Sequence, residues 1–436
     1  MTKINLDIDV HYVTRVEGHG NIVVNVKDGK PEKIQWQVPE APRFFEAMVV
    51  GQKWDVLHHI TSRICGICSI GHTLASLKAT EAAMDIKISE QTAKLRRLAI
   101  HGENLQSHTL HVGYLVLPDL MGVGSVVPLA TSHPAELKMV IDLHKLANEF
   151  SDLTTGRTTH PQRLIPGGFT KLPTKKELET VRQRIIDAEK DIDGVTGLLK
   201  ALAPKIPNFT RETEYISLTH DGEYALYDGD LCSSDGDRGN INDYLSWTNE
   251  YIVPQSTAKY TKRKRESLMA GALARFNNNH KQLKPKAKKI AEDLGLVAPC
   301  YNPYMNSVAQ HVECMHTLED SLDIIDGLLK TGIDYDDIYP KITPKAGQGV
   351  GVVEVPRGIL IHDYTYDENG VCTVANCVIP TNQNHANIQL DMEKLVPEII
   401  DKPKEEVELT LEMLVRAYDP CISCSTHYLK VEFKDQ

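Results

Sequence analysis

The N-terminal part of the chain alternates between hydrophobic and polar positions. The segments INLDIDVHYV (residues 4–13) and NIVVNV (21–26) change character at almost every second residue. Asp28 and Gly29 then separate NIVVNV from PEKIQWQV. Alternation with a period of two is typical of half-buried strands, and Asp-Gly is a frequent hairpin turn. We therefore expect small β elements over about residues 1–40.

Hydrophobic positions then recur every three to four residues, which is the period of an amphipathic helix. Leu95, Leu98 and Leu105 follow this spacing, and Ser89 is a suitable residue to cap the start of their helix. The same pattern predicts further helices over four ranges: 175–203, 262–294, 308–330 and 403–418.

These patterns predict one large domain over residues 1–427. Within it, a helical core spans about 41–345, and a β- and turn-rich segment spans about 346–400. A C-terminal segment, about 401–427, completes the domain. The predicted fold class is α+β and predominantly α, with a central bundle of long helices and small peripheral β elements.

Composition excludes some classes of function. The formal net charge of -11 is spread along the chain, whereas a nucleic-acid partner would require a basic face. No hydrophobic run approaches the about 18 residues of a membrane span, and we see no secretory signal. An odd number of cysteines, nine, without such a signal favours a reducing, cytoplasmic location.

Two Cys-x-x-Cys motifs near opposite ends of the chain carry the strongest chemical signal. RICGICSIGH contains Cys65 and Cys68, DPCISCSTH contains Cys421 and Cys424, and a histidine follows each pair. Two such turns facing each other would offer four soft sulfur ligands to zinc, to an iron–sulfur cluster, or to nickel and iron. A non-enzymatic scaffold subunit with a structural zinc site is one interpretation, although zinc ribbons usually place their pairs about 15–20 residues apart.

The two motifs together resemble the paired signatures of the large, catalytic subunit of nickel-iron hydrogenases. Those signatures read R-x-C-G-x-C-x-x-x-H and D-P-C-x-x-C-x-x-H. Further matching segments occur in order along nearly the whole chain: TRVEGHG, RFFEAM, HPQRLIPGG, AGALARFNNN, VPRGIL and VIPTNQN. The resemblance implies the fold of that family and the reversible, heterolytic cleavage of H2 to protons and electrons.

The resemblance also implies a nickel–iron centre held by the four cysteines. Cys65 and Cys421 would be terminal ligands of nickel, and Cys68 and Cys424 would bridge nickel to iron. Carbon monoxide and cyanide would complete the coordination of the iron. Thiolates suit this role because they are soft, electron-rich ligands.

Two catalytic residues follow from the same resemblance. Glu17, in TRVEGHG, would be the first proton carrier, and the guanidinium of Arg357, in VPRGIL, would lie over the metals. Without the resemblance, an exposed glutamate and a surface arginine would be the ordinary interpretations.

Four further residues are expected around the ligands: Arg63, His72, Thr381 and Ser107. His72 would donate a hydrogen bond to the sulfur of Cys68, and Thr381 would donate to a cyanide. Ser107 stands where many family members have an aspartate, so the charge around the metals would differ here.

Glu46, the main-chain carbonyl of Cys377 and His427 would bind a separate hard cation, often magnesium. An oxygen-rich, hydrated shell is typical of magnesium, whereas the imidazole ligand rests on the resemblance alone. The other four cysteines fit no ligand pattern and are expected to be small buried hydrophobic residues: Cys232, Cys300, Cys314 and Cys372.

In most of the family an endopeptidase cuts directly after the histidine that corresponds to His427. This sequence continues as YLKVEFKDQ, residues 428–436. The resemblance therefore implies either a propeptide removed by a maturation endopeptidase or a retained tail.

Partner subunits are implied because the remaining cysteines lack iron–sulfur spacing. The resemblance points to an iron–sulfur small subunit. In the cytoplasmic, group 3-like branch of the family, toward which this chain leans, further subunits pass electrons to NAD(P), to a deazaflavin or to a heterodisulfide reductase.

Overall fold

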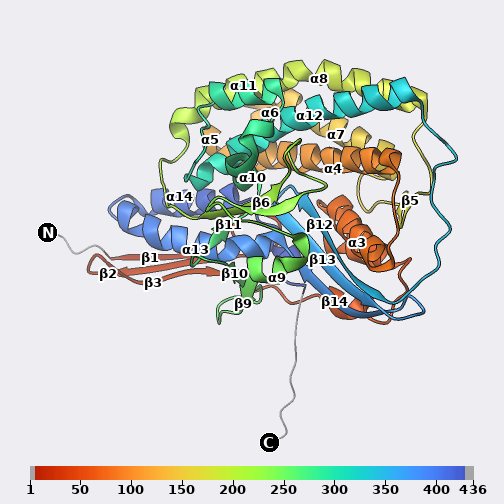
Figure 1. The fold of residues 1–436 in the computed structure, drawn as a ribbon. Coiled ribbons are helices and arrows are strands. Elements are labelled where there is room, and N and C mark those ends of the chain that lie inside the picture. The colour runs from red at the N-terminus through yellow and green to blue at the C-terminus, as the bar shows by residue number, and fades with distance from the viewer. Residues whose placement is uncertain (1–4, 428–436) are drawn as a thin grey trace, which may run out of the picture.

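Long helices form one layer of the molecule, and the sheets lie in the opposite half (Figure 1). The computed structural model describes residues 5–427. The helices that pack on one another in this layer are α4 (Glu90–Leu110), α7 (Pro134–Thr155), α8 (Lys175–Leu202) and α12 (Asn306–Thr331). The Ser89 side chain accepts a 3.0 Å hydrogen bond from the N–H of Thr92, which confirms the predicted cap. The predicted bundle of long helices is thus present.

The N-terminal sheet has the predicted order of strands. β1 (Leu6–Val10), β2 (Asn21–Lys27) and β3 (Lys30–Gln37) pair antiparallel. The turn between β2 and β3 has φ values of 51° at Asp28 and 77° at Gly29, as Asp-Gly hairpins favour.

A second three-stranded sheet lies deeper than the sequence predicts. It consists of β12 (Gly347–Val355), β13 (Gly358–Tyr366) and β14 (Cys372–Val378), and its face packs on α3 (Ser69–Met84). A Cβ atom at Gly351 of β12 would lie 2.1 Å from the carbonyl oxygen of Ala75, so only glycine permits this approach. The sheet therefore forms a rigid seat for the helix that follows the first cysteine motif.

Two predicted segments differ in the structure. The helix expected over 262–294 is divided into α10 (Ala272–Asn279) and α11 (Pro285–Asp293). Lys284 is extended, and Pro285 starts a new helix because proline suits the first helical turn but not the interior. The β- and turn-rich segment contains an unexpected helix, α13 (Pro380–Ile399). In its first half, residues 380–388, the polar residues are buried as well as the apolar ones, so no amphipathic stripe marks that half.

The remaining helices are α1 (Phe45–Val49), α2 (Leu57–Thr61), α5 (Leu117–Met121), α6 (Leu129–Ser132), α9 (Tyr244–Trp247), α14 (Lys404–Ala417) and α15 (Ile422–Ser425). The remaining strands are β4 (Leu164–Ile165), β5 (Gly168–Phe169), β6 (Glu214–Thr219), β7 (Asp230–Ser233), β8 (Arg238–Gly239), β9 (Asn249–Tyr251), β10 (Tyr260–Lys262) and β11 (Leu268–Met269). These elements include α14, which matches the helix predicted over 403–418, and the four-stranded sheet of order β11-β6-β7-β8.

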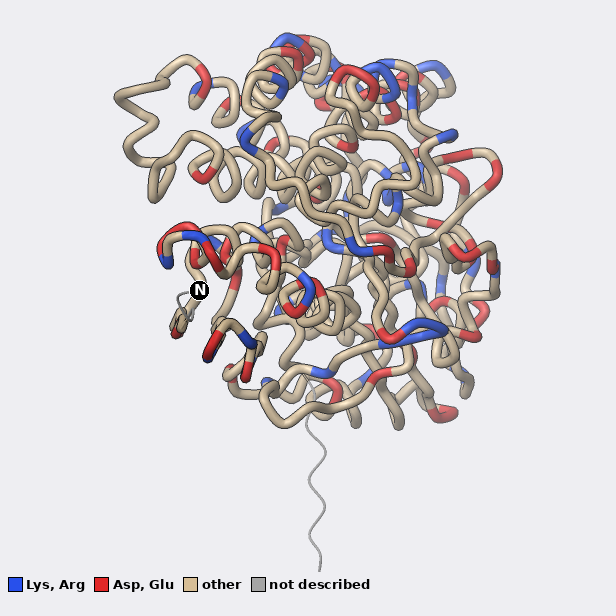
Figure 2. The backbone as a smooth tube through the Cα atoms, turned by 90° about the vertical axis from the view of Figure 1, so that its left-hand side faces the viewer, with Lys and Arg blue, Asp and Glu red and all other residues tan. Residues whose placement is uncertain are grey.

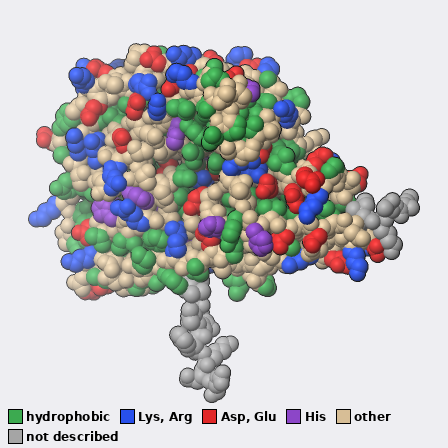
Figure 3. Space-filling view, turned by 180° about the vertical axis from the view of Figure 1, so that it is seen from behind, with side chains coloured by type: hydrophobic (Ala, Val, Ile, Leu, Met, Phe, Trp, Pro, Cys, Tyr) green, Lys and Arg blue, Asp and Glu red, His purple; other side chains and the backbone are tan. Residues whose placement is uncertain are grey.

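Charged side chains of both signs are distributed over the molecule. Among the described residues, no helix is long and apolar enough to cross a bilayer. Acidic and basic residues are interspersed along the backbone in Figure 2, and both are mixed with hydrophobic side chains on the face shown in Figure 3. Of the four cysteines expected to be buried, Cys314 and Cys372 are, whereas Cys232 and Cys300 are only partly buried.

Candidate metal centre

The two Cys-x-x-Cys motifs meet in the interior. Cys65 follows a short 3-10 turn, and Cys68 is the residue directly before α3. Cys421 directly precedes α15, and Cys424 lies within that helix. All four are buried, and their sulfur atoms lie within 4.8 Å of one another.

The sulfur–sulfur distances suit shared metal ligation. The Sγ atoms of Cys65 and Cys421 are 3.3 Å apart, those of Cys68 and Cys424 are 3.8 Å apart, and those of Cys421 and Cys424 are 2.8 Å apart. Thiolates at about 2.3 Å from one metal lie roughly 3.3–3.8 Å from one another. The two distances between the motifs match this range, whereas the 2.8 Å separation within the second motif is shorter. The chain thus brings four soft donors to one buried point.

The pKa shifts of the thiols indicate that the cluster favours bound cations. Hydrogen bonds from neighbouring thiols hold the pKa of Cys65 well below its usual range. Burial raises the pKa of Cys421 and that of Cys424 well above theirs. One negative charge is therefore stabilised by the other thiols, and further deprotonation requires positive charge among the sulfurs.

Glu17 contacts the second motif through both backbone and side chain. Its carbonyl oxygen accepts a 2.9 Å hydrogen bond from the N–H of Ile422. Its Oε2 accepts from the Sγ of Cys421 at 3.2 Å and from the N–H of Ser423 at 3.1 Å, and the Ser423 hydroxyl donates to Oε1. Glu17 is half-buried, and its carboxylate contacts a ligand sulfur. Ser423 was not predicted, although it lies inside the motif.

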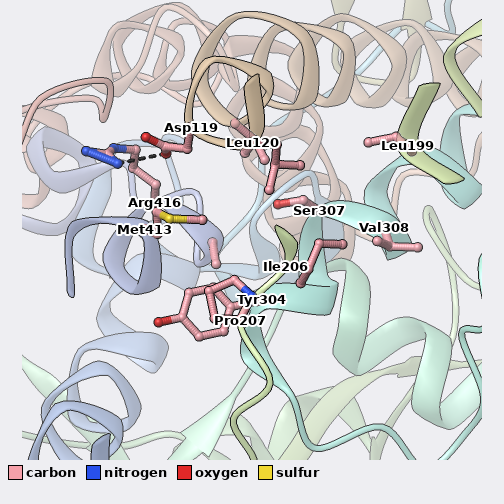
Figure 4. Close-up of a pocket in the computed structure, with 12 residues that line it drawn as sticks. Asp119, Leu120, Leu199, Ile206, Pro207, Tyr304, Ser307, Val308, Met413 and Arg416 are labelled. Atoms are coloured by element: carbon pink, nitrogen blue, oxygen red, sulfur yellow. Dashed lines mark hydrogen bonds and ion pairs between the residues drawn. The ribbon is translucent and has the colours of Figure 1, made fainter. Parts of the chain in front are cut away.

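Ion pairs fix the segment that carries Glu17. Arg15 and Arg416 both pair with Asp119, and the Nε of Arg416 donates to the carbonyl oxygen of Thr14 at 3.1 Å. Figure 4 shows the 2.7 Å pair of Asp119 and Arg416 beside a cavity of about 30 Å³. Apolar side chains dominate the rest of its lining, and no predicted site residue contributes to it. The network therefore joins the two chain segments that meet at Glu17 and Cys421.

Arg357 lies beside the cluster and is paired with an aspartate of the second motif. Its Nε donates to the carbonyl oxygen of Asp419 at 2.5 Å, and its Nη2 pairs with Oδ1 at 2.8 Å. Its Nη1 is buried and has no hydrogen-bond partner among the described residues. A free donor at this position fits an anionic or polar ligand on a bound metal. Asp419, which was not predicted, has a φ of 50°, an uncommon conformation that its contacts maintain.

Of the four residues expected around the ligands, three are buried and one is exposed. Thr381 accepts the N–H of Cys421 at 3.1 Å. The Ser107 hydroxyl is buried without a partner among the described residues, and His72 is buried one turn after Cys68. Arg63 is exposed, so its guanidinium lies at the surface and not among the buried groups.

A second group of predicted residues comes together next to the cluster. The Nε2 of His427 lies 2.8 Å from the carbonyl oxygen of Cys377 and 3.4 Å from Oε1 of Glu46. Adjacent ligands of a cation with bonds of about 2.1 Å lie about 3 Å apart. The Oε2 of Glu46 is buried and has no partner within the described part of the chain, which leaves a carboxylate oxygen for such a cation.

Glu103 of α4 is a buried carboxylate that no motif indicated. Its Oε2 accepts the N–H of Ile70 at 2.7 Å, and its Oε1 and Oε2 each lie 3.1 Å from the N–H of Gly71. It thereby occupies the start of α3, where helix N–H groups need acceptors. Burial raises the pKa of Glu103 to about 8.

Comparison with known proteins places this site in a family. The family described as nickel-dependent hydrogenase matches residues 43–139 and 240–427. Sulfhydrogenase 1 subunit alpha of Pyrococcus furiosus is 31% identical over 433 residues, covering 99% of this chain and 100% of the relative. Sulfhydrogenase 2 subunit alpha of the same organism is 30% identical over 433 residues, covering 97% and 100%.

A solved structure confirms the fold. An NAD+-reducing NiFe-hydrogenase in the H2-reduced state superimposes with a TM-score of 0.88 and 26% identity, covering 97% of this chain and 99% of the other. Fold, motifs and buried sulfur cluster thus agree. The chain belongs to the nickel-dependent hydrogenase family, as a large, catalytic subunit whose four-cysteine cluster is the metal site.

Proposed function

We propose that this chain catalyses the reversible conversion of H2 into two protons and two electrons at a nickel–iron centre. The observation that carries the proposal is the convergence of the sulfurs of Cys65, Cys68, Cys421 and Cys424 at one buried point. When bound, the metals with their carbon monoxide and cyanide ligands would polarise H2 and accept its electrons. Cys65 and Cys421 would hold nickel, and Cys68 and Cys424 would bridge it to iron.

Glu17 would carry the proton away from the metals. Its Oε2 already accepts a hydrogen bond from the Sγ of Cys421, so a proton on that sulfur has a direct route to the carboxylate. The hydroxyl and N–H of Ser423 would keep the carboxylate oriented toward the sulfur. Because Glu17 is half-buried, it can release the proton toward solvent.

Three residues would support the diatomic ligands and the bridging sulfur. The unpartnered Nη1 of Arg357 and the hydroxyl of Thr381 would donate to cyanide, and His72 would donate to Cys68. Ser107 would leave the pocket less acidic than an aspartate would. We propose no such contact for Arg63, whose exposed side chain suits the surface near the first motif.

A magnesium ion would be bound by Glu46, the carbonyl oxygen of Cys377 and Nε2 of His427, with water completing its shell. This ion would fix the C-terminal end of the second motif, since His427 lies three residues after Cys424.

The electrons would leave through an iron–sulfur small subunit. The relatives are named as alpha subunits of sulfhydrogenases, and the solved relative is named as NAD+-reducing. We propose a cytoplasmic complex with further electron-transfer subunits, linked to NAD(P), a deazaflavin or a heterodisulfide. Residues 428–436, which lie outside the described residues, would be a propeptide removed by a maturation endopeptidase or a retained tail.

Infrared spectroscopy with metal analysis tests the function. We expect the natively matured complex to contain nickel and iron, to show stretching bands of metal-bound carbon monoxide and cyanide, and to exchange H2 with deuterated solvent. Zinc alone, without these bands, would support a structural site in a scaffold subunit and refute the proposal.

A further inference from the structure

Helix α3 packs on strand β13 (Figure 1). Between the two elements lies a buried seam of polar side chains, beside the metal site. His362, Tyr364 and Tyr366 alternate along β13, and all three are almost fully buried. Opposite them on α3 lie His72 and Thr80, two turns apart and equally buried. Buried polar groups need hydrogen-bond partners, and here they provide them for one another.

Three of these side chains form a continuous chain of hydrogen bonds. The Nδ1 of His72 lies 3.2 Å from Nε2 of His362, and Nδ1 of His362 lies 2.6 Å from the hydroxyl of Tyr364. The hydroxyl of Tyr366 instead pairs with Thr80 at 2.7 Å. Tyr366 and Thr80 therefore form a separate pair on the same seam.

The members of the chain are fully buried, and neither hydrogen bond involves a carboxylate, so the surroundings favour uncharged side chains. Two ring nitrogens that lie 3.2 Å apart form a hydrogen bond only if one carries a hydrogen and the other accepts it. A neutral imidazole has one N–H donor and one acceptor nitrogen. Consequently the direction of one hydrogen bond determines the direction of every other bond in the chain.

The sulfur end of the chain sets that direction. A thiolate only accepts hydrogen bonds, so an imidazole that faces the sulfur of Cys68 carries its proton on Nε2 and leaves Nδ1 to accept a hydrogen bond from Nε2 of His362. His362 therefore carries its proton on Nε2, and its Nδ1 accepts a hydrogen bond from the hydroxyl of Tyr364.

We propose that Tyr364 and His362 are positioning residues that fix His72 as the Nε2–H tautomer, directed at the sulfur of Cys68. The inference rests on the proposed function, in which this sulfur bridges the metals. The N–H of His72 donates to the carbonyl oxygen of Cys68 at 3.1 Å. Because helical side chains lean toward the N-terminus, the imidazole points back toward that residue. A donor held there withdraws charge from the thiolate and so tunes the metals.

Nitrogen NMR of histidine in the natively matured complex tests the chain. With ¹⁵N-labelled histidine and the His72 signal assigned by a His72→Gln variant, we expect a protonated Nε2 and an unprotonated Nδ1. Tyr364→Phe removes one hydrogen bond and should shift the ratio of the two tautomers about fivefold or more toward Nδ1–H. Tyr366→Phe, which loses an equally buried hydroxyl outside the chain, should leave the ratio unchanged.

The same samples separate this inference from the function on which it rests. In a nickel-containing complex, Tyr364→Phe should also move the carbon monoxide and cyanide bands to lower frequency, and Tyr366→Phe should not. His72 protonated on Nδ1 in the unmodified complex, or an unchanged tautomer ratio in Tyr364→Phe, would overturn the inference even if the bands are present. Absence of nickel and of the bands would overturn the function, whatever tautomer His72 has.

Discussion

The two cysteine motifs have the same spacing but are held in place in different ways. Cys68 directly precedes a helix of 16 residues. Glu103 accepts hydrogen bonds from N–H groups in the first turn of this helix, and the helix backbone lies directly on β12. Cys424 lies in a helix of only four residues. Distant residues hold that short helix, chiefly Glu17 and the pair of Arg357 and Asp419.

The difference shows how one half of the site is built locally and the other by tertiary contacts. A long helix on a sheet is rigid in itself, whereas a single helical turn has little stability of its own. The first motif should therefore tolerate changes far away in the chain better than the second. The residues that hold the second motif come from several elements. One of them, Glu17, can therefore also carry a proton.

Replacing a ligand should affect both halves equally and most severely. We expect Cys421→Ser and Cys65→Ser each to abolish nickel retention and H2 turnover, because serine is a harder and less acidic ligand. The loss should far exceed the about 10–100-fold cost of changing an outer partner of a metal site. Cys314→Ser, a buried cysteine outside the cluster, is the matched control. Full activity in Cys421→Ser would show that the ligand assignment is wrong.

Glu17→Gln should separate metal binding from proton transfer at the second motif. Glutamine keeps hydrogen-bonding atoms but cannot carry a proton, so turnover and H/D exchange should fall by about 10²–10⁴-fold while nickel stays bound. Glu40→Gln, in the same N-terminal region, should have little effect. Unchanged exchange in Glu17→Gln would remove this residue from the mechanism.

Glu103→Gln should show how much free energy the burial of a carboxylate beside the first motif costs. The pKa of Glu103 is raised by burial from 4.5 to about 8 in the folded chain. Protonated Glu103 stabilises the folded chain, and this contribution to the free energy of unfolding is fully present below about pH 4.5. It is lost as the pH rises through 8, a change of up to about 5 kcal/mol. Glutamine does not titrate, so the variant lacks this pH dependence. The stability of wild type relative to Glu103→Gln should thus fall between pH 5.5 and 8.5, as measured by thermal unfolding of the complexes. A difference that does not depend on pH would contradict the assignment.

Ser423→Ala should have the smallest effect. It removes the hydroxyl that donates to Glu17 but leaves the N–H of the same residue in place. The loss of one hydrogen bond of about 1 kcal/mol predicts a roughly fivefold slower proton exchange. Ser62→Ala, whose hydroxyl bonds to the carbonyl oxygen of His59, is the control beside the first motif. A loss as large as that of Glu17→Gln would indicate that Ser423 carries the proton itself.

Sequence reasoning found the residues that lie inside recognisable motifs. Glu17, Arg357 and Thr381 lie in short segments with a fixed order, so their positions near the cysteines followed from resemblance. Glu103 could not be found in this way, because it acts on α3 only through the packing of α4. Asp419 was visible in DPCISCSTH, but its role depends on the place of Arg357 in three dimensions.

The fold shows the same limit. The amphipathic helix α8 was predicted closely because one of its faces is polar and exposed. The first half of helix α13 is surrounded by protein, and polar residues such as Asn382 and Asn384 are buried in it, whereas exposed residues such as Glu393 and Glu398 lie in the second half. A hydrophobic stripe cannot indicate a helical segment that has no exposed face.

Anomalous X-ray diffraction at the nickel and iron edges of crystals of the matured complex tests the central claim most directly. We predict one nickel and one iron peak between the sulfurs of Cys65, Cys68, Cys421 and Cys424. A single zinc peak at that position, or nickel bound elsewhere in the chain, would contradict it.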